Sequence, residues 1–293
     1  MNNSYTGRPF PHGLTAAQLK LLAMALMVID HIGAFLLPRE SAMYPVCRAI
    51  GRLAFPIFCY LIAEGARHTR SMPKYMARLA VFALISTPPF CLVHGSAWYS
   101  LEAPNVFFTL LFGLAGIFCI QNFAPWVYQN AGQHHLAKNK TACALLGLPF
   151  CMTLYFAAYA LHTDHGGYGV AAILIFWLLW ESPLPAWGIF ALLTFVCHDF
   201  AFVKYGEFGL IDYAMMNPYA LLSHRVWEGG YEIIFVNARQ VAAPLALIPC
   251  AFYNGQKGSL LPPQSKGAKY EKYIFYAFYP IHLLVIWLIQ RSL

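Results

Sequence analysis

The stretch LLAMALMVIDHIGAFLL, residues Leu21–Leu37, decides the fold class of this chain. It is apolar throughout except for Asp30 and His31. An ionised group near the centre of a membrane-spanning helix costs roughly 2.5–3.5 kcal/mol on insertion scales, so a pair kept at such a place indicates a use for it. The alternative is that the apolar run ends near Ile29 and that the pair lies among lipid headgroups, where polar groups cost little.

The whole chain of 293 residues has the composition of a membrane protein, with 59% hydrophobic and 11% charged residues. A soluble domain carries about 25% charged residues. Backbone amides must be satisfied internally in lipid, which leaves helices to span it. We therefore predict an all-α, polytopic helical bundle with about nine to ten transmembrane helices. It forms a single transmembrane domain over residues 19–293, after a polar N-terminal segment over 1–18.

Apolar runs recur from one end of the chain to the other. The predicted spans are Leu19–Leu37, Val46–Ala66, Tyr75–Val93, Val106–Gln121, Ala142–Leu161, Tyr168–Trp180, Ala186–Cys197, Tyr231–Tyr253 and Tyr273–Gln290. A tenth segment, Phe208–Leu222, contains Asp212 and Pro218 and is equally compatible with a re-entrant or interfacial piece.

The net charge of +7 lies in a few short connections between these runs. This distribution is typical of a topology signal and not of a continuous nucleic-acid-binding face, so we expect no nucleic-acid partner. The basic connection between the second and third spans is predicted to be cytoplasmic. The loop that holds Lys257 and Lys272 is then also cytoplasmic if there are nine spans. The eight Cys form no C-x-x-C pair, and we expect no metal site.

Arg48 and Arg52 lie four residues apart and so share one helix face. A guanidinium fork suits a carboxylate or a phosphate. The pair therefore binds Asp30 or an anionic donor, or else anchors the helix at the outer surface. Lys20, at the opposite end of the first span from His31, is either functional or an interfacial anchor.

A second group of polar residues follows at the inner end of the second span. It consists of Glu64 and the basic residues Arg67, Arg70, Lys74 and Arg78. The basic residues could hold the phosphates of a nucleotide-like cofactor, or they could only set the topology. In the last span, Tyr279 and His282 are either functional or make simple hydrogen bonds between helices.

Several of these stretches together resemble the TraX family, the F-pilin acetylation proteins of conjugation systems. The matching segments are Leu19–Gly33, Gly51–Phe58, Glu64–Arg70, Lys74–Arg78, Phe82–Ser86, Asn105–Gly113 and Lys272–Leu283, with Asp164 and Tyr168–Val170 in the less similar middle. The family looks related to multi-span membrane acyltransferases, which take acetyl groups from acetyl-CoA.

The resemblance implies an acetyltransferase of the bacterial inner membrane, with acetyl-CoA as co-substrate and a pilin N-terminal amine, or another membrane-embedded acceptor, as partner. His31 would be the general base that deprotonates the acceptor. Asp30, Arg48 and Arg52 would complete the catalytic group. Lys20, Arg67, Arg70, Lys74 and Arg78 would bind the CoA phosphates.

Two other functions are compatible with the same residues. A transporter could relay protons through Asp30, His31 and His282. A non-enzymatic partner in pilus assembly could use the polar residues only to hold helices together.

Overall fold

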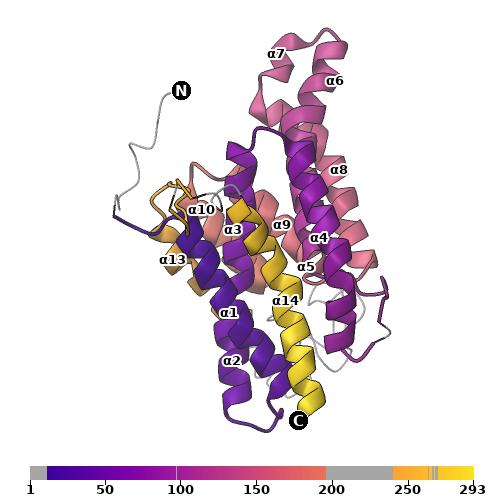
Figure 1. Cartoon of the computed structure of the whole chain (residues 1–293). Coiled ribbons are helices and arrows are strands. Elements are labelled where there is room, and N and C mark those ends of the chain that lie inside the picture. Colours follow the sequence, from indigo (N-terminus) through magenta and orange to yellow (C-terminus); the bar gives the residue numbers. More distant parts are fainter. Residues whose placement is uncertain (1–11, 97, 196–239, 263, 266, 268–269) are drawn as a thin grey trace, which may run out of the picture. The chain divides into compact units, whose positions relative to one another are not determined.

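The structure is a computed structural model that describes residues 12–195 except 97, and residues 240–293 except 263, 266, 268 and 269 (Figure 1). Its described residues are helical, without a strand. They form two compact units. The first unit comprises Met1–Phe58 and Ser182–Lys272, and the second comprises Cys59–Glu181 and Tyr273–Leu293. The all-helical fold class is confirmed, and the single domain over 19–293 stays a prediction.

In the first unit, α1 and α2 run side by side (Figure 1). The helices of this unit are α1 (Ala16–Leu36), α2 (Met43–Gly51), the start of α3 (Ala54–His68), α10 (Pro183–Thr194), the 3₁₀ turn η5 (Gln240–Ala246) and α13 (Leu247–Ala251). A capping box formed by Thr15 and Gln18 begins α1. Each of these two side chains accepts a hydrogen bond from the other's backbone N–H, which satisfies two donors at the helix end.

The second unit contains the rest of α3 and a group of long apolar helices. They are α4 (Met72–Val93), α5 (Val106–Phe118), the π-helical turn η1 (Cys119–Phe123), α6 (Ala124–Asn130), α7 (His134–Ala137), α8 (Lys140–Ala160), α9 (Gly166–Leu178) and α14 (Glu271–Ser292). Helix α5 packs against α4, α8 and α9. Tyr276 and Tyr279 of α14 contact Phe107 of α5.

Six helical stretches of the described chain are long and apolar enough to cross a membrane. They are Ala16–Leu36, Met43–His68, Met72–Val93, Val106–Asn130, Lys140–Ala160 and Glu271–Ser292. Three shorter apolar helices, Gly166–Leu178, Pro183–Thr194 and Ala242–Ala251, overlap further predicted spans. The protein is therefore a multi-pass helical membrane protein. The doubtful segment Phe208–Leu222 and the start of Tyr231–Tyr253 lie outside the described residues.

The second predicted span is broken, because α2 ends at Gly51 and α3 begins at Ala54. Proline explains the position of the break. Pro56 has no N–H to donate to the carbonyl of Arg52, and its ring would collide with that carbonyl in a continuous helix. Arg52 therefore sits at the end of α2.

A short backbone pairing fixes the start of α1 against the loop that follows α13. Leu14 donates its N–H to the Phe252 carbonyl at 2.7 Å, and Asn254 donates back to the Leu14 carbonyl at 2.9 Å. Ala16 and Ala17 then donate to the Gln256 and Lys257 carbonyls. The loop with Lys257 thus lies at the same end as the start of α1, where the arrangement with nine spans requires it.

Asn105 joins α4 to α5 in the interior of the second unit. It is fully buried, and its amide donates to the Ala83 carbonyl at 2.8 Å and to the Thr87 hydroxyl at 3.3 Å. Its side-chain oxygen accepts the Phe107 N–H at 3.1 Å, which caps α5. One side chain thereby satisfies a helix end and an interhelical contact.

We expect Asn105→Ala to lower the free energy of unfolding by about 1–3 kcal/mol, since it removes the cap and leaves buried polar groups unpaired. Thermal unfolding in detergent, followed by tryptophan fluorescence, measures the change. Asn130→Ala is the matched control, because Asn130 is exposed at the end of α6. Equal melting temperatures for the two variants would contradict this role of Asn105.

Candidate functional site

Asp30 of α1 is held by two arginines of the next helix. Arg48 donates from Nη1 to Asp30 Oδ2 at 2.6 Å. Arg52 donates from Nη2 to Oδ1 at 2.8 Å and to Oδ2 at 2.6 Å. Asp30 is 8% exposed, and charge-assisted bonds of this kind are among the strongest in proteins. Of the two partners predicted for the arginine pair, the structure shows Asp30. We call these three residues the ionic triad.

Small residues let α1 and α2 approach closely enough for the triad to form. A Cβ atom added at Gly51 would overlap the side chain of Asp30. A Cβ atom at Gly33, one turn further along α1, would lie 2.7 Å from the Cβ of Cys47. The sequence therefore places a glycine on each helix at the crossing, with the charged groups beside it.

The triad carries a net charge of +1, since one carboxylate faces two guanidinium groups. Both carboxylate oxygens already accept arginine N–H groups. Asp30 is thus suited to positioning α2 and its arginines, and not to accepting a proton from a substrate. Two guanidinium groups side by side make the neighbourhood of the triad suited to an anion or a developing negative charge.

His31 follows Asp30 on α1 and is half-buried. Its ring centroid lies 5.6 Å from that of Phe35, one turn later on the same helix. Asp30 bonds the two arginines of the next helix. His31 points about 100° away from Asp30 around α1, as neighbouring residues of a helix do. Rigid anchoring of Asp30 therefore fixes the backbone that carries His31.

Of the predicted phosphate-binding residues, Lys20 lies in the first unit and the other four lie in the second. Arg67 already has a partner, because its Nη2 bonds Glu181 Oε1 at 2.7 Å. Its guanidinium also lies over the Trp180 ring, 5.4 Å from the centroid. Trp180 also stacks on Tyr60 with ring centroids 4.9 Å apart. These contacts hold α3 against the residues that directly follow α9.

Arg78 has a different environment, although the sequence places it in the same basic group. Its guanidinium lies over Tyr75, 5.4 Å from the ring centroid. Its Nε is buried and has no hydrogen-bond acceptor among the described residues. The Tyr75 hydroxyl in turn lies 3.0 Å from where a Cβ of Gly65 would stand. A buried donor without an acceptor is suited to binding an anion.

Sequence reasoning missed Tyr75 and Gly65 as parts of this cluster. The only available signal was the three-residue spacing of Tyr75 and Arg78, which places both on one face of α4. Glu64, predicted as a site residue, lies next to Gly65 on α3 and approaches His68 Nε2 at 3.6 Å. Its side chain is 12% exposed, against 49% for that of His68.

The two predicted residues of α14 are packed inside the second unit. Tyr279 meets Phe107 edge to face, with centroids 5.2 Å apart. His282 Nδ1 lies 2.9 Å from the Phe278 carbonyl of its own helix, and the rings of these two residues stack. These contacts are those of packed core residues.

The loop His162–His165 connects α8 to α9 through two non-glycine residues with positive φ, 53° at His162 and 66° at His165. Asp164 holds the loop in place, because its N–H donates to the Pro104 carbonyl at 2.8 Å and its own carbonyl accepts the Thr109 hydroxyl. Within the described ranges, no three His, Cys, Asp or Glu side chains converge as metal ligands.

Comparison with known proteins assigns the family. The sequence model of the TraX protein family matches residues 15–290. The chain belongs to the TraX family. The match begins at the N-cap of α1 and ends within α14, so it includes the ionic triad and both units.

Among the curated relatives of this TraX protein is the probable fimbrial assembly protein FimC, serogroup H1, of Dichelobacter nodosus. It is 26% identical over 281 residues, which cover 93% of this chain and 94% of the relative. An uncharacterized protein, RP591, of Rickettsia prowazekii (strain Madrid E) is 50% identical over 42 residues, or 14% of this chain and 15% of the relative. No solved structure matches. The name of the Dichelobacter nodosus relative links that protein to the assembly of fimbriae.

The close approach at the triad makes a testable demand on Gly51. We expect Gly51→Ala to lower the free energy of unfolding by about 1–3 kcal/mol, because the added methyl group forces Asp30 out of place. Thermal unfolding of the purified protein in detergent measures this.

Gly188→Ala in α10 is the matched control, since no atom lies within 4 Å of the added Cβ. We expect this change to be neutral or stabilising by up to about 1 kcal/mol. A Gly51→Ala variant as stable as the wild type would show that the helices do not cross at this glycine.

Proposed function

We propose that the protein is an integral membrane acetyltransferase that moves an acetyl group from cytoplasmic acetyl-CoA to a membrane-associated acceptor, with a pilin N-terminal amine as the favoured acceptor. The TraX match over residues 15–290 carries this proposal. The half-buried His31, beside a triad with net positive charge, supports it from the side of the chemistry.

In this reaction His31 takes a proton from the ammonium form of the acceptor. The free amine then attacks the thioester carbonyl carbon, and a C–N bond forms as the C–S bond breaks. The amide nitrogen releases its second proton to the departing CoA thiolate, and the His31 imidazolium gives its own proton to water, which restores the neutral ring. A positioned general base of this kind contributes typically 10²–10⁴-fold to the rate.

The triad has two roles in this proposal. Asp30 positions the arginines through the bonds described above. The guanidinium groups of Arg48 and Arg52 then stabilise the negative charge that develops on the thioester oxygen. Asp30 is accordingly a positioning residue.

The CoA phosphates are assigned to the basic residues, as the family resemblance implies. Arg78 is the best supported of these, because its buried Nε lacks an acceptor among the described residues. Arg67 is the least supported, because Glu181 already pairs with it. Lys20, Arg70 and Lys74 keep the role that the sequence predicts for them.

A role as a non-enzymatic pilus assembly partner is the second candidate, and the name of the Dichelobacter nodosus relative, a probable fimbrial assembly protein, favours it. Under that candidate the triad only holds α1 against α2. The proton-transporter alternative has less support, because both oxygens of Asp30 are engaged by arginines. Purified protein in lipid, given acetyl-CoA with and without pilin-derived acceptor peptide, separates the three by release of free CoA thiol.

We expect His31→Ala to abolish acetylated product while the protein remains folded in the membrane. The measurement is acetylation of the peptide by mass spectrometry, with thermal unfolding as the check on folding. His134→Ala, an exposed histidine of α7, is the control and should retain activity. Unchanged acetylation by the His31 variant would remove this residue from the mechanism.

We expect Arg78→Gln to raise KM for acetyl-CoA about tenfold or more with a smaller change in kcat, because a charge-assisted bond to a phosphate contributes roughly 1.5–3 kcal/mol. Steady-state kinetics with varied acetyl-CoA measure both constants. Arg39→Gln, an exposed arginine after α1, is the control. A loss confined to kcat would assign Arg78 to another role.

A further inference from the structure

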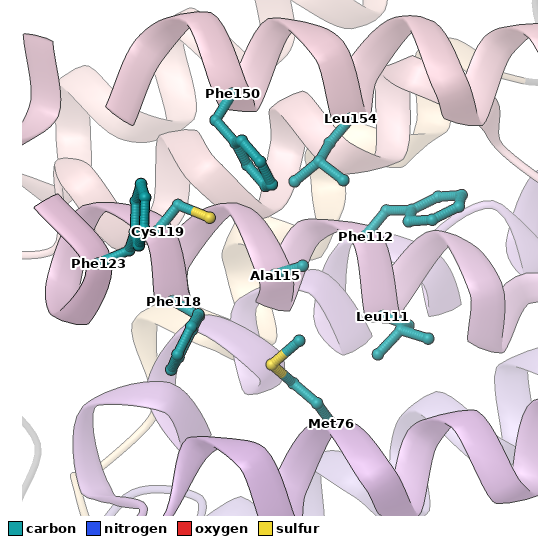
Figure 2. A pocket seen from close by; sticks show the side chains of 9 residues that line it. All are labelled: Met76, Leu111, Phe112, Ala115, Phe118, Cys119, Phe123, Phe150 and Leu154. Carbon is teal, nitrogen blue, oxygen red and sulfur yellow. The ribbon is translucent and has the colours of Figure 1, made fainter. Parts of the chain in front are cut away.

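The second unit contains an apolar hollow of about 410 Å³ between α4, α5, η1 and α8, and no predicted site residue lines it (Figure 2). Its lining side chains are Met76, Leu111, Phe112, Ala115, Phe118, Cys119, Phe123, Phe150 and Leu154. None of them carries a nitrogen or oxygen atom. Figure 2 shows Phe150 and Leu154 of α8 along one side and Met76 of α4 on the other, with α5 between them.

The π-helical turn contributes to the shape of this hollow. Cys119 and Phe123, the first and last residues of η1, both line it. A π-turn inserts a residue into a helix and is frequent at functional sites. The turn lies at one end of the hollow, and the rings of Phe118 and Phe123 line this end (Figure 2).

The size and lining of the hollow restrict what can occupy it. A ten-residue piece of helix is at least about 10 Å wide and 15 Å long, which corresponds to about 1,200 Å³. That is more than the hollow encloses, so a helix of a partner protein could cover its opening but could not enter it. A polar ligand would lose its hydrogen bonds to water without replacement. A narrow hydrocarbon chain meets both conditions.

The charge at the end of the hollow that contains Phe123 is positive. Helix α8 runs antiparallel to α5 and α6, since the Tyr128 hydroxyl donates to the Ala142 carbonyl at 3.2 Å and Ile120 packs on Gly147. Phe123 therefore lies level with about residue 145. The exposed Lys140 then lies five residues, or about 8 Å along the axis, beyond this end. Lys138 is exposed beside it.

No acidic residue offsets these lysines within the segment that builds the hollow. The sequence from Ala103 to Thr163 contains no Asp and no Glu. Basic groups next to an interhelical pocket at the cytoplasmic surface are characteristic of sites for anionic lipid headgroups. By the charge rule, the start of α8 lies at that surface.

We propose that this hollow is a binding site for an anionic phospholipid, with one acyl chain among the aromatic and aliphatic side chains and the phosphate against Lys138 and Lys140. The site is independent of the acetyltransferase proposal, because it shares no residue with the ionic triad, His31 or the CoA-binding set. It attaches the α5–α8 hairpin to the leaflet whose headgroups it binds.

Native mass spectrometry of the full-length, delipidated protein tests this site. The probes are phosphatidylglycerol and phosphatidylcholine with identical acyl chains. We expect the first phosphatidylglycerol to bind about tenfold or more tightly than phosphatidylcholine, given the contribution of each lysine at a membrane surface. The double variant Lys138→Gln and Lys140→Gln should remove this preference without weakening phosphatidylcholine. Lys257→Gln is the control lysine and should keep the preference.

Filling the hollow should weaken both lipids. Ala115→Phe places a ring inside it, whereas Leu145→Phe adds the same ring at a position of α8 that is 65% exposed and should change neither affinity. In the wild type, phosphatidylglycerol with a photoreactive acyl chain should crosslink to peptides within Leu111–Phe123 and Phe150–Leu154. This measurement remains decisive if Ala115→Phe does not fold.

Four results would overturn the proposal. They are equal affinity of the wild type for the two lipids, crosslinks spread evenly over the spans, displacement of the bound lipid by an acceptor peptide, and a dimer whose contact buries the hollow.

Discussion

The placement of one carboxylate inside an apolar helix constrains much of the first unit. Asp30 needs compensation wherever lipid surrounds α1, and two arginines four residues apart on α2 provide it. The requirement extends to the backbone. The residues at the crossing must be glycines, because a Cβ there would overlap the other helix. In addition, α2 must end where Pro56 prevents its continuation. Charge, helix packing and the helix break are therefore parts of one solution.

The same interaction gives two neighbouring residues of α1, Asp30 and His31, different roles. A carboxylate with both oxygens bound to guanidinium groups is a poor candidate for proton transfer, whereas the next residue is a half-buried imidazole. Removing one partner of a buried ion pair is costly because it leaves an uncompensated charge. Asp30 thus keeps α2 in place, and the neighbouring imidazole of His31 is the group to which the proposed function assigns proton transfer.

The sequence predicted most of the spans, because long apolar runs in lipid have helices as their plausible outcome. It also placed Arg48 and Arg52 on one helix face, from their four-residue spacing, and gave Asp30 as one of their possible partners. It did not predict the pairing of Arg67 with Glu181, which lie 114 residues apart. The π-turn and the apolar hollow were equally inaccessible, because each depends on how side chains of several distant helices pack.

The backbone pairing at the start of α1 has a consequence for biosynthesis. Gly13, whose carbonyl accepts a hydrogen bond from the Asn254 amide, precedes its partner by 241 residues. At about 10 residues per second, a ribosome needs about 24 seconds to make the intervening chain. During that time α1 is already in the translocon or the bilayer, but its first turn lacks the hydrogen bonds to the loop after α13. The N-terminal end of the earliest helix is thus the last to gain its hydrogen-bond partners.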